Sequence, residues 1–283
     1  MKKLLATLAT LALTATATVA TFGFAGCGED KLVVYTEAGF APFEYISNSK
    51  IVGVDVDIMN KVGEKLGKKV VFENVNFDTI IDAVSAGKLC KVGAAGISIT
   101  EERAAKVNFS AEYYTANLYV IYKVNDSSEY ESTTTDGVTG VYWDSLAGKG
   151  IAVQTGTTAD LFLGDELAEG GILDGTDAYD VQCTELSVAV ANIGSGDADV
   201  VIIDELPAKQ LIKNDSSLKC SPLYYQGGED EDDEAAVDVY AICVTKGQDE
   251  ILKAINEVLA ELKAEDHDGI DGIQYLVNKH LGL

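Results

Sequence analysis

The sequence has only two histidines, His267 and His280, in 283 residues. Both lie in the charged C-terminal region, and neither belongs to a motif with a serine or cysteine partner. No Ser–His or Cys–His catalytic arrangement can therefore be argued. We expect both histidines to be surface residues.

Cysteine is also sparse. Beyond Cys27 there are Cys90, Cys183, Cys220 and Cys243, and none has the spacing of a metal site or of a C-x-x-C redox motif. The sequence therefore implies no metal and no cofactor. Cys220 and Cys243 could form a disulfide in an oxidising compartment or stay free, because buried free cysteines are common core residues.

Positive charge is scarce. Lys and Arg total 21 against 46 Asp and Glu, which gives a formal net charge of −25 at pH 7. A chain this acidic will not bind nucleic acid through phosphate contacts, and it suits a solvated extracellular protein. The acidic run at residues 229–234 lacks the spaced ligands and turn glycine of a calcium loop, so we expect a solvated loop.

Only one long apolar run is present, at the N-terminus. Two lysines precede an uncharged Leu/Ala/Thr-rich run that ends at Gly26, which is the pattern of a secretory signal over residues 1–26. Its end, Ala25-Gly26-Cys27, resembles the bacterial lipobox, in which Cys27 would be lipidated. An uncleaved membrane anchor is the alternative. In both cases we expect the functional part to lie outside the cytoplasm.

Predicted strands alternate with predicted helices in the rest of the chain. The first unit has strands at 32–36, 70–72 and 92–97, and helices at 54–66 and 79–86. The second has strands at 150–153, 178–181 and 200–203, and helices at 159–169 and 186–193. A strand at 239–244 and helices at 249–263 and 270–281 follow. This order predicts an α/β fold with mostly parallel sheets covered by helices.

Two segments of the chain resemble each other. Residues 81–92 and 187–200 each contain a helix that ends at glycine, a short turn and an apolar strand leading to a polar motif. Two α/β lobes of related design explain this similarity. Residues 127–140, rich in Ser, Thr and Gly, are predicted to be a surface loop at the start of the second lobe.

Arg103 stands in the first turn of a predicted helix that Thr100 could cap. A cation is unfavourable there beside the positive end of the helix dipole, so the arginine needs a partner. The partner could be an anionic ligand held by both arms of the guanidinium group, next to Ser98. The alternative is an ion pair with Glu101 or Glu102 in solvent.

Other candidate residues also follow predicted strands, at the carboxyl ends where open α/β sheets bind ligands. They are Glu37, Phe40, the segment 154–158 and Asp204. Each has a simpler explanation: Asp204 as a helix cap, Phe40 and Phe77 as core, and Glu37 as a solvated loop residue. Together with Arg103, however, they supply what a zwitterionic α-amino acid requires, namely donors for its carboxylate and an acceptor for its ammonium.

Six motifs carry a resemblance to the extracellular amino-acid-binding proteins of bacterial ABC importers. They are APFEY at 41–45, VGVDVDI at 52–58, ISITEER at 97–103, VNFSAEYY at 107–114, TGTT at 155–158 and VIIDELP at 201–207. In this order and spacing they cover essentially the whole chain after the signal.

The resemblance implies a two-lobed periplasmic-binding fold. Lobe 1 would comprise residues 29–115 and 240–283, and lobe 2 residues 116–239, with hinge crossings near 113–117 and 238–241. Such a protein closes on one polar amino acid and delivers it to a membrane permease. It would act as a monomer tethered by its lipid anchor, and no enzymatic activity is implied.

The resemblance also assigns roles in the site. Arg103 would bind the ligand α-carboxylate, helped by Ser98 and the Thr158 N–H, and Asp204 would bind the α-ammonium. The remaining assignments are Phe40 and Phe77 beside the ligand side chain, Glu37 and Gln154 as specificity positions, and Gly96 within the site.

Two other functions stay open on the sequence alone. Secreted cyclohexadienyl or arogenate dehydratases have a similar fold and use a cleft carboxylate as a general acid. A sensor that reports ligand to a membrane partner is the third possibility. If the protein serves an ABC importer, arginine, lysine, histidine and glutamine all remain candidate ligands, and Glu37 favours a cationic or amide-bearing side chain.

Overall fold

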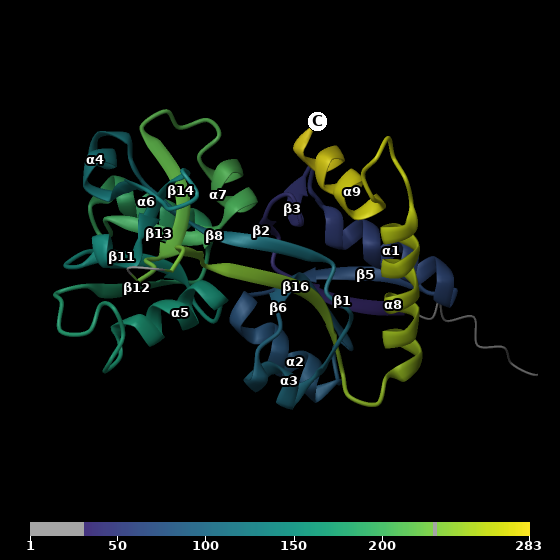
Figure 1. The fold of residues 1–283 in the computed structure, drawn as a ribbon. Helices are drawn as coiled ribbons and strands as arrows, with labels where there is room; N and C mark the ends of the chain where they lie inside the picture. The colour runs from purple at the N-terminus through teal and green to yellow at the C-terminus, as the bar shows by residue number, and fades with distance from the viewer. Residues whose placement is uncertain (1–30, 229–230) are drawn as a thin grey trace, which may run out of the picture.

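The computed structural model describes residues 31–228 and 231–283, so the predicted signal segment 1–26 and Cys27 lie outside the described residues. Figure 1 shows two lobes joined by two long strands, β8 (Tyr114–Lys123) and β16 (Val237–Val244). No helix in the described part of the chain is long and apolar enough to cross a membrane.

The sheet of the first lobe has three parallel strands. Strand β1 (Lys31–Thr36) lies between β5 (Lys69–Asn74) and β6 (Val92–Ser98), and β16 adds to β6 in the antiparallel direction. Parallel neighbours need a crossover connection, and helices α1 (Val54–Leu66) and α2 (Ile80–Ala86) supply it. The carboxyl ends of these three parallel strands therefore lie at the same edge of the sheet.

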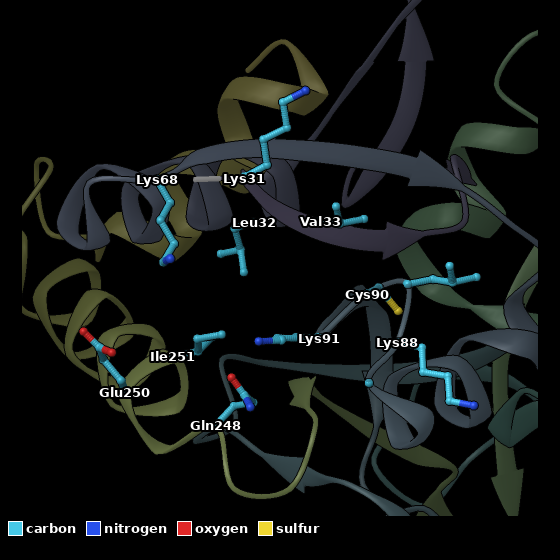
Figure 2. A pocket seen from close by; sticks show the side chains of 12 residues that line it. Lys31, Leu32, Val33, Lys68, Lys88, Cys90, Lys91, Gln248, Glu250 and Ile251 are labelled. Atoms are coloured by element: carbon cyan, nitrogen blue, oxygen red, sulfur yellow. The ribbon is translucent and has the colours of Figure 1, made fainter. Parts of the chain in front are cut away.

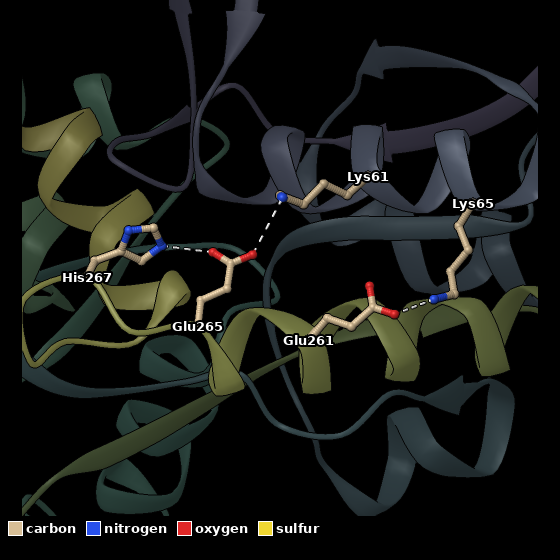
Figure 3. Close-up of polar contacts among 5 residues, drawn as sticks. All are labelled: Lys61, Lys65, Glu261, Glu265 and His267. Carbon is tan, nitrogen blue, oxygen red and sulfur yellow. Dashed lines mark hydrogen bonds and ion pairs between the residues drawn. The ribbon is translucent and has the colours of Figure 1, made fainter.

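The C-terminal helices return to this lobe. Helix α8 (Asp249–Ala264) buries Ile251, Ile255, Val258, Leu259 and Leu262 in the core that it shares with α1, and α9 (Gly272–Leu281) follows it. Ion pairs also join α1 to α8 and to the residue after it: Lys65 to Glu261 at 2.6 Å and Lys61 to Glu265 at 3.8 Å (Figure 3). Exposed pairs of this kind contribute only about 0–1 kcal/mol each, so apolar packing holds the helices together.

The second lobe repeats the design. Strands β12 (Tyr179–Cys183), β11 (Gly150–Gln154) and β13 (Val200–Asp204) are parallel, and β8 and β14 (Leu218–Tyr225) continue the sheet in antiparallel fashion. The lobe also contains helices α5 (Thr158–Leu167), α6 (Leu186–Ser195) and α7 (Glu205–Leu211). The prediction of an α/β fold with mostly parallel sheets is confirmed.

Strands β8 and β16 pair where the chain passes between the lobes. Their register places Asp238 opposite Ala116 and Tyr240 opposite Tyr114. The two connecting segments therefore run side by side as an antiparallel pair, although they are far apart in the sequence. This pair brings residues of β16 to the boundary between the lobes.

The remaining elements are short. They are β2 (Gly39–Phe40), β3 (Glu44–Ser47), β4 (Lys50–Val52), a 3₁₀ turn (Phe77–Thr79), α3 (Glu101–Lys106), β7 (Asn108–Phe109), a 3₁₀ turn (Val124–Asp126), a 3₁₀ turn (Trp143–Leu146) and β15 (Glu234–Ala235). The internal similarity seen in the sequence is real, because α2 and α6 end at Gly87 and Gly196, both with left-handed backbone angles.

The predicted surface loop at 127–140 is wrong. This segment forms α4 (Ser127–Tyr130), β9 (Glu131–Thr133) and the start of β10 (Thr139–Tyr142). Strand β10 pairs with β14, and Tyr130 packs in the core of the second lobe. A Ser/Thr/Gly-rich composition does not distinguish a loop from short strands whose partner lies elsewhere in the chain.

Two further expectations are decided by packing. His280 is not a surface residue, because its ring is hydrogen-bonded to the Tyr45 hydroxyl at 3.2 Å and to Asp57 at 3.0 Å where α9 meets α1. Of the two possibilities left open for Cys220 and Cys243, a disulfide or free thiols, the structure shows free thiols. The two residues stand in different strands, β14 and β16.

Candidate functional site

A cavity lies between the lobes, at the carboxyl ends of β1 and β6 on one side and of β11 and β13 on the other. Its empty volume is about 300 Å³, at the lower end of the range for small-molecule sites. The lining comprises Glu37, Phe40, Glu44, Phe77, Ala95, Gly96, Ser98, Gln154, Thr157, Thr158, Asp204 and Asp238. Of the nine ligand-binding residues that the resemblance assigns, eight line this cavity. Arg103 does not, although it is hydrogen-bonded to the carbonyl of Ser98, which does.

Arg103 is the only arginine in the sequence. Thr100 caps α3 by accepting the Arg103 N–H at 3.2 Å, and the arginine side chain turns into the protein with 7% of the residue exposed. Its Nη1 donates to the Ser98 carbonyl and its Nη2 to the Gly156 carbonyl, both at 2.7 Å. The alternative of a solvent-exposed ion pair with a neighbouring glutamate is therefore wrong.

The guanidinium group bridges the two lobes, because Ser98 ends β6 and Gly156 precedes α5. Two of its five N–H groups are used by these carbonyls, which leaves donors for a further acceptor. Burial lowers the pKa of Arg103, and the charge of Asp238 opposes that shift. The Phe77 ring lies 5.6 Å from Cζ and covers the group on one side.

Asp204 ends β13 and occupies the N-cap position of α7, but its side chain makes no capping hydrogen bond. The carboxyl group is buried, and its Oδ1 has no hydrogen-bond partner. Burial, followed by the negative charge of Asp238, raises the pKa of Asp204 well above its usual range. A buried carboxyl oxygen without a partner at a cavity wall is suited to receive a donor from a ligand.

Glu37 and Gln154 face each other from the two lobes. Glu37 follows β1 and is only 9% exposed, and Gln154 ends β11 and donates to the Thr184 carbonyl at 3.1 Å. Burial raises the pKa of Glu37, while the Gln154 amide and the Gly39 N–H oppose the shift. The charge of Glu37 at this end of the cavity therefore depends on the groups that lie next to it.

Gly96 shapes the wall beside Phe40. Its φ of +53° is in the left-handed region, and a Cβ added there would lie 2.7 Å from Cε1 of Phe40. Its N–H donates to Asp55 at 3.1 Å. Only glycine combines this backbone angle with this close approach.

Gly96→Ala should therefore weaken both folding and ligand binding. We expect a loss of about 1–2 kcal/mol of stability from the left-handed backbone alone, with further loss where Phe40 is displaced. Chemical denaturation and calorimetric titration of the same preparation measure the two effects. Gly137→Ala is a matched control, since Gly137 also has positive φ but open space around it. Equal effects of the two substitutions would show that contact with Phe40 is unimportant.

Sequence reasoning missed two acidic residues of the cavity, Glu44 and Asp238. Glu44 is fully buried, neither carboxyl oxygen has a partner, and burial followed by the charge of Asp55 raises its pKa well above the usual range. Both residues stood inside segments singled out for another reason, the motif at 41–45 and the crossing at 238–241. Nothing local in either segment says that its carboxyl group faces a ligand.

A second cavity, with an empty volume of about 800 Å³, lies at the opposite, amino ends of β1 and β6 (Figure 2). Four lysines contribute to its lining, Lys31, Lys68, Lys88 and Lys91, and no aromatic residue does. It offers no carboxylate–arginine combination that would match both charges of an amino acid. The cavity between the lobes is therefore the candidate site.

The fold and this site define a two-lobed solute-binding protein. The chain belongs to the bacterial extracellular solute-binding proteins, family 3, whose model matches residues 32–270. The expectation of a binding protein is confirmed, and the dehydratase alternative is not favoured, because the relatives are substrate-binding proteins of transporters.

Relatives and solved structures agree with this family. The arginine-binding extracellular protein ArtP of Bacillus subtilis (strain 168) is 29% identical over 68% of each chain. The histidine-binding periplasmic protein of Escherichia coli (strain K12) is 26% identical over 94% of this chain and 93% of its own. The L-arginine-bound structure of AbpA, an amino acid ABC transporter substrate-binding protein from Streptococcus pneumoniae, has a TM-score of 0.70 at 26% identity, covering 89% of this chain and 94% of its own.

Proposed function

We propose that this protein binds a cationic L-amino acid of the arginine type and delivers it to the permease of an ABC importer. The observation that carries the proposal is the excess of buried carboxyl groups over cationic groups around the cavity. Four buried carboxyl groups, on Glu37, Glu44, Asp204 and Asp238, line it, and Arg103 is the only guanidinium group beside it. An arginine ligand brings two cationic groups and one carboxylate, which complements this set.

The ligand backbone would lie between Arg103 and Asp204. Arg103 would bind the α-carboxylate with its remaining N–H groups, helped by Ser98 and by the Thr158 N–H. That N–H belongs to the first turn of α5, where N–H groups have no partner within the helix. Asp204 would accept from the α-ammonium through its unpartnered oxygen.

The ligand side chain would extend towards Glu37 and Gln154, between Phe40 and Phe77. Desolvated anions are costly unless a cation meets them, so a buried Glu37 selects for a cationic side chain and against a carboxylate. A neutral amide ligand would satisfy hydrogen bonds at Glu37 but would leave more of the cavity charge unpaired. The relatives named for arginine and histidine support the cationic choice.

Lobe 1, residues 29–115 and 240–283, and lobe 2, residues 116–239, would close on the ligand by bending at β8 and β16. The protein would act as a monomer, tethered outside the membrane through a lipid on Cys27 after removal of residues 1–26. Closure would then present both lobes together to the permease.

The ligand assignment can be tested with a thermal-shift panel of the twenty amino acids and cystine. A ligand present at 100 times its Kd stabilises the protein by about 2.7 kcal/mol, which is readily measured. We expect arginine to give the largest shift, followed by lysine, histidine and glutamine. A best response to glutamate or aspartate would contradict the proposal, because Glu37 would then face a like charge in a closed cavity.

Glu37→Gln distinguishes a cationic ligand from an amide ligand. The substitution should weaken arginine binding by more than about 1.4 kcal/mol, which is tenfold in Kd, because the charge partner of the guanidinium group is lost. Glutamine should lose little, since it can still donate to the new amide carbonyl. Calorimetry with both ligands, with Glu73→Gln as an exposed control on β5, measures the contrast. Equal loss for both ligands would assign Glu37 a purely structural role.

A further inference from the structure

The carboxylate of Asp238 is held at the point where the lobes and the connecting strand meet. It stands on β16 with 5% of the residue exposed. Oδ1 accepts the N–H of Val239 at 2.7 Å, and Oδ2 accepts the Ser98 hydroxyl at 2.6 Å. The Thr158 hydroxyl donates to the same Oδ2 over a still shorter distance. Asp238 therefore collects one hydroxyl from each lobe.

Each hydroxyl has one proton and two lone pairs. Ser98 and Thr158 lie 3.3 Å apart, so they also touch each other, but both are closer to the carboxylate than to one another. Their protons are therefore directed to Oδ2 of Asp238. The lone pairs are what these two hydroxyls have left for a ligand in the cavity that they line.

Asp204 completes the same part of the wall, and its state differs from that of Asp238. Asp238 has both oxygens occupied by donors of the protein, whereas Oδ1 of Asp204 has none. Asp238 is thus already satisfied without a ligand, while Asp204 is open to one. Arg103 supplies the donors on the other side of Ser98, from whose carbonyl it is 2.7 Å away.

We propose that Asp238 is a positioning residue that sets the hydrogen-bond polarity of Ser98 and Thr158, so that both hydroxyls accept from the ligand α-ammonium. This inference rests on the proposed function and refines it: the Ser98 hydroxyl moves from the carboxylate to the ammonium, and the carboxylate is left to Arg103 and the Thr158 N–H. Ser98 comes from one lobe and Thr158 from the other, so the acceptor set exists only while the lobes are together.

The consequence is a selectivity that depends on Asp238, a residue of the cavity lining, through its effect on the two hydroxyls. An α-ammonium has three donors and fits a wall of acceptors, whereas a hydroxyl in its place has one donor and leaves acceptors unpaired. L-Arginine and its 2-hydroxy analogue, which carries OH where arginine carries NH₃⁺, differ only in this group. The wild-type protein should discriminate between them by at least about 100-fold.

The test compares calorimetric Kd values for these two compounds in wild type, Asp238→Asn and Thr158→Val. The amide in Asp238→Asn has one acceptor oxygen, so it cannot accept the Val239 N–H on one side and both hydroxyls on the other as the carboxylate does. With its NH₂ group towards the hydroxyls, a hydroxyl accepts from the amide and can then donate into the cavity. We expect arginine to weaken at least tenfold and the analogue to change less than threefold, so the discrimination falls. Thr158→Val should lower the discrimination by removing one acceptor, and Thr158→Ser should retain it.

Asp232→Asn provides a matched control, because it makes the same change at an exposed position of the returning segment, outside the cavity. Equal weakening of both compounds in Asp238→Asn, with the ratio unchanged, would overturn the inference and leave Asp238 a structural residue. If Asp238→Asn does not fold, the Thr158 pair still tests the acceptor role of the hydroxyls, and an unchanged ratio in Thr158→Val would overturn the inference. Failure of wild type to bind any amino acid in the panel would overturn the proposed function and this inference with it.

Discussion

Replacing Arg103 with alanine should abolish most ligand binding. The ligand α-carboxylate would be left desolvated in a closed cavity with no cation beside it, which costs about 2–5 kcal/mol for a buried charge pair. At 1.4 kcal/mol per factor of ten, Kd should rise by about 30-fold to several thousand-fold. The chain offers no substitute, since it contains no other arginine.

Arg103→Lys should also weaken binding substantially. An ammonium group can replace the charge, but it cannot donate to the Ser98 and Gly156 carbonyls and to a carboxylate in the same planar arrangement. Titration calorimetry on both variants measures the loss, and Lys106→Ala, an exposed position on the same helix, is the control. An alanine variant within threefold of wild type would contradict the carboxylate assignment.

Asp204→Asn should produce the second large loss. Hydrogen bonds to charged groups contribute about 1.5–3 kcal/mol, and the neutral amide removes one partner of the α-ammonium. Because the side chain makes no capping hydrogen bond, the variant should melt close to wild type in the absence of ligand. The N-acetyl form of the best ligand should fail to bind to the wild-type protein for the same reason.

The pH dependence gives a separate check on Asp204. Burial and the charge of Asp238 raise its pKa, so the group gains a proton at a higher pH than an exposed aspartate would. The protonated form cannot pair with an ammonium, and ligand affinity should therefore fall as the pH is lowered through that pKa. Asp204→Asn should flatten this dependence, with Asp144→Asn, an exposed change in the same lobe, as control. Equal binding of the N-acetylated and free forms of the best ligand would contradict the assignment of the α-ammonium to Asp204, whose position would then matter only for the start of α7.

Much of the fold could be predicted from the sequence because its signals are local. The helix at 54–66 was predicted at its observed bounds from the spacing of Val54, Ile58 and Val62, which the structure buries in the core. The failure at 127–140 has the opposite cause. Strand β10 forms because β14 is available to pair with it, and no property of the segment reports the presence of that partner.

By itself, the sequence determined the alternation of helices with the three parallel strands of each lobe, and it placed an arginine five residues after Ser98 at the start of a helix. It did not predict β8 or β14, which complete the sheet of the second lobe. The features that it determined depend on residues a few positions apart, whose relation the covalent chain enforces. Only the tertiary structure decided that Asp238 accepts the hydroxyls of Ser98 and Thr158, which are 140 and 80 positions away. A hydrogen bond exists only within about 3 Å, and whether residues so distant in the chain approach that closely depends on how β16 and the two lobes pack together.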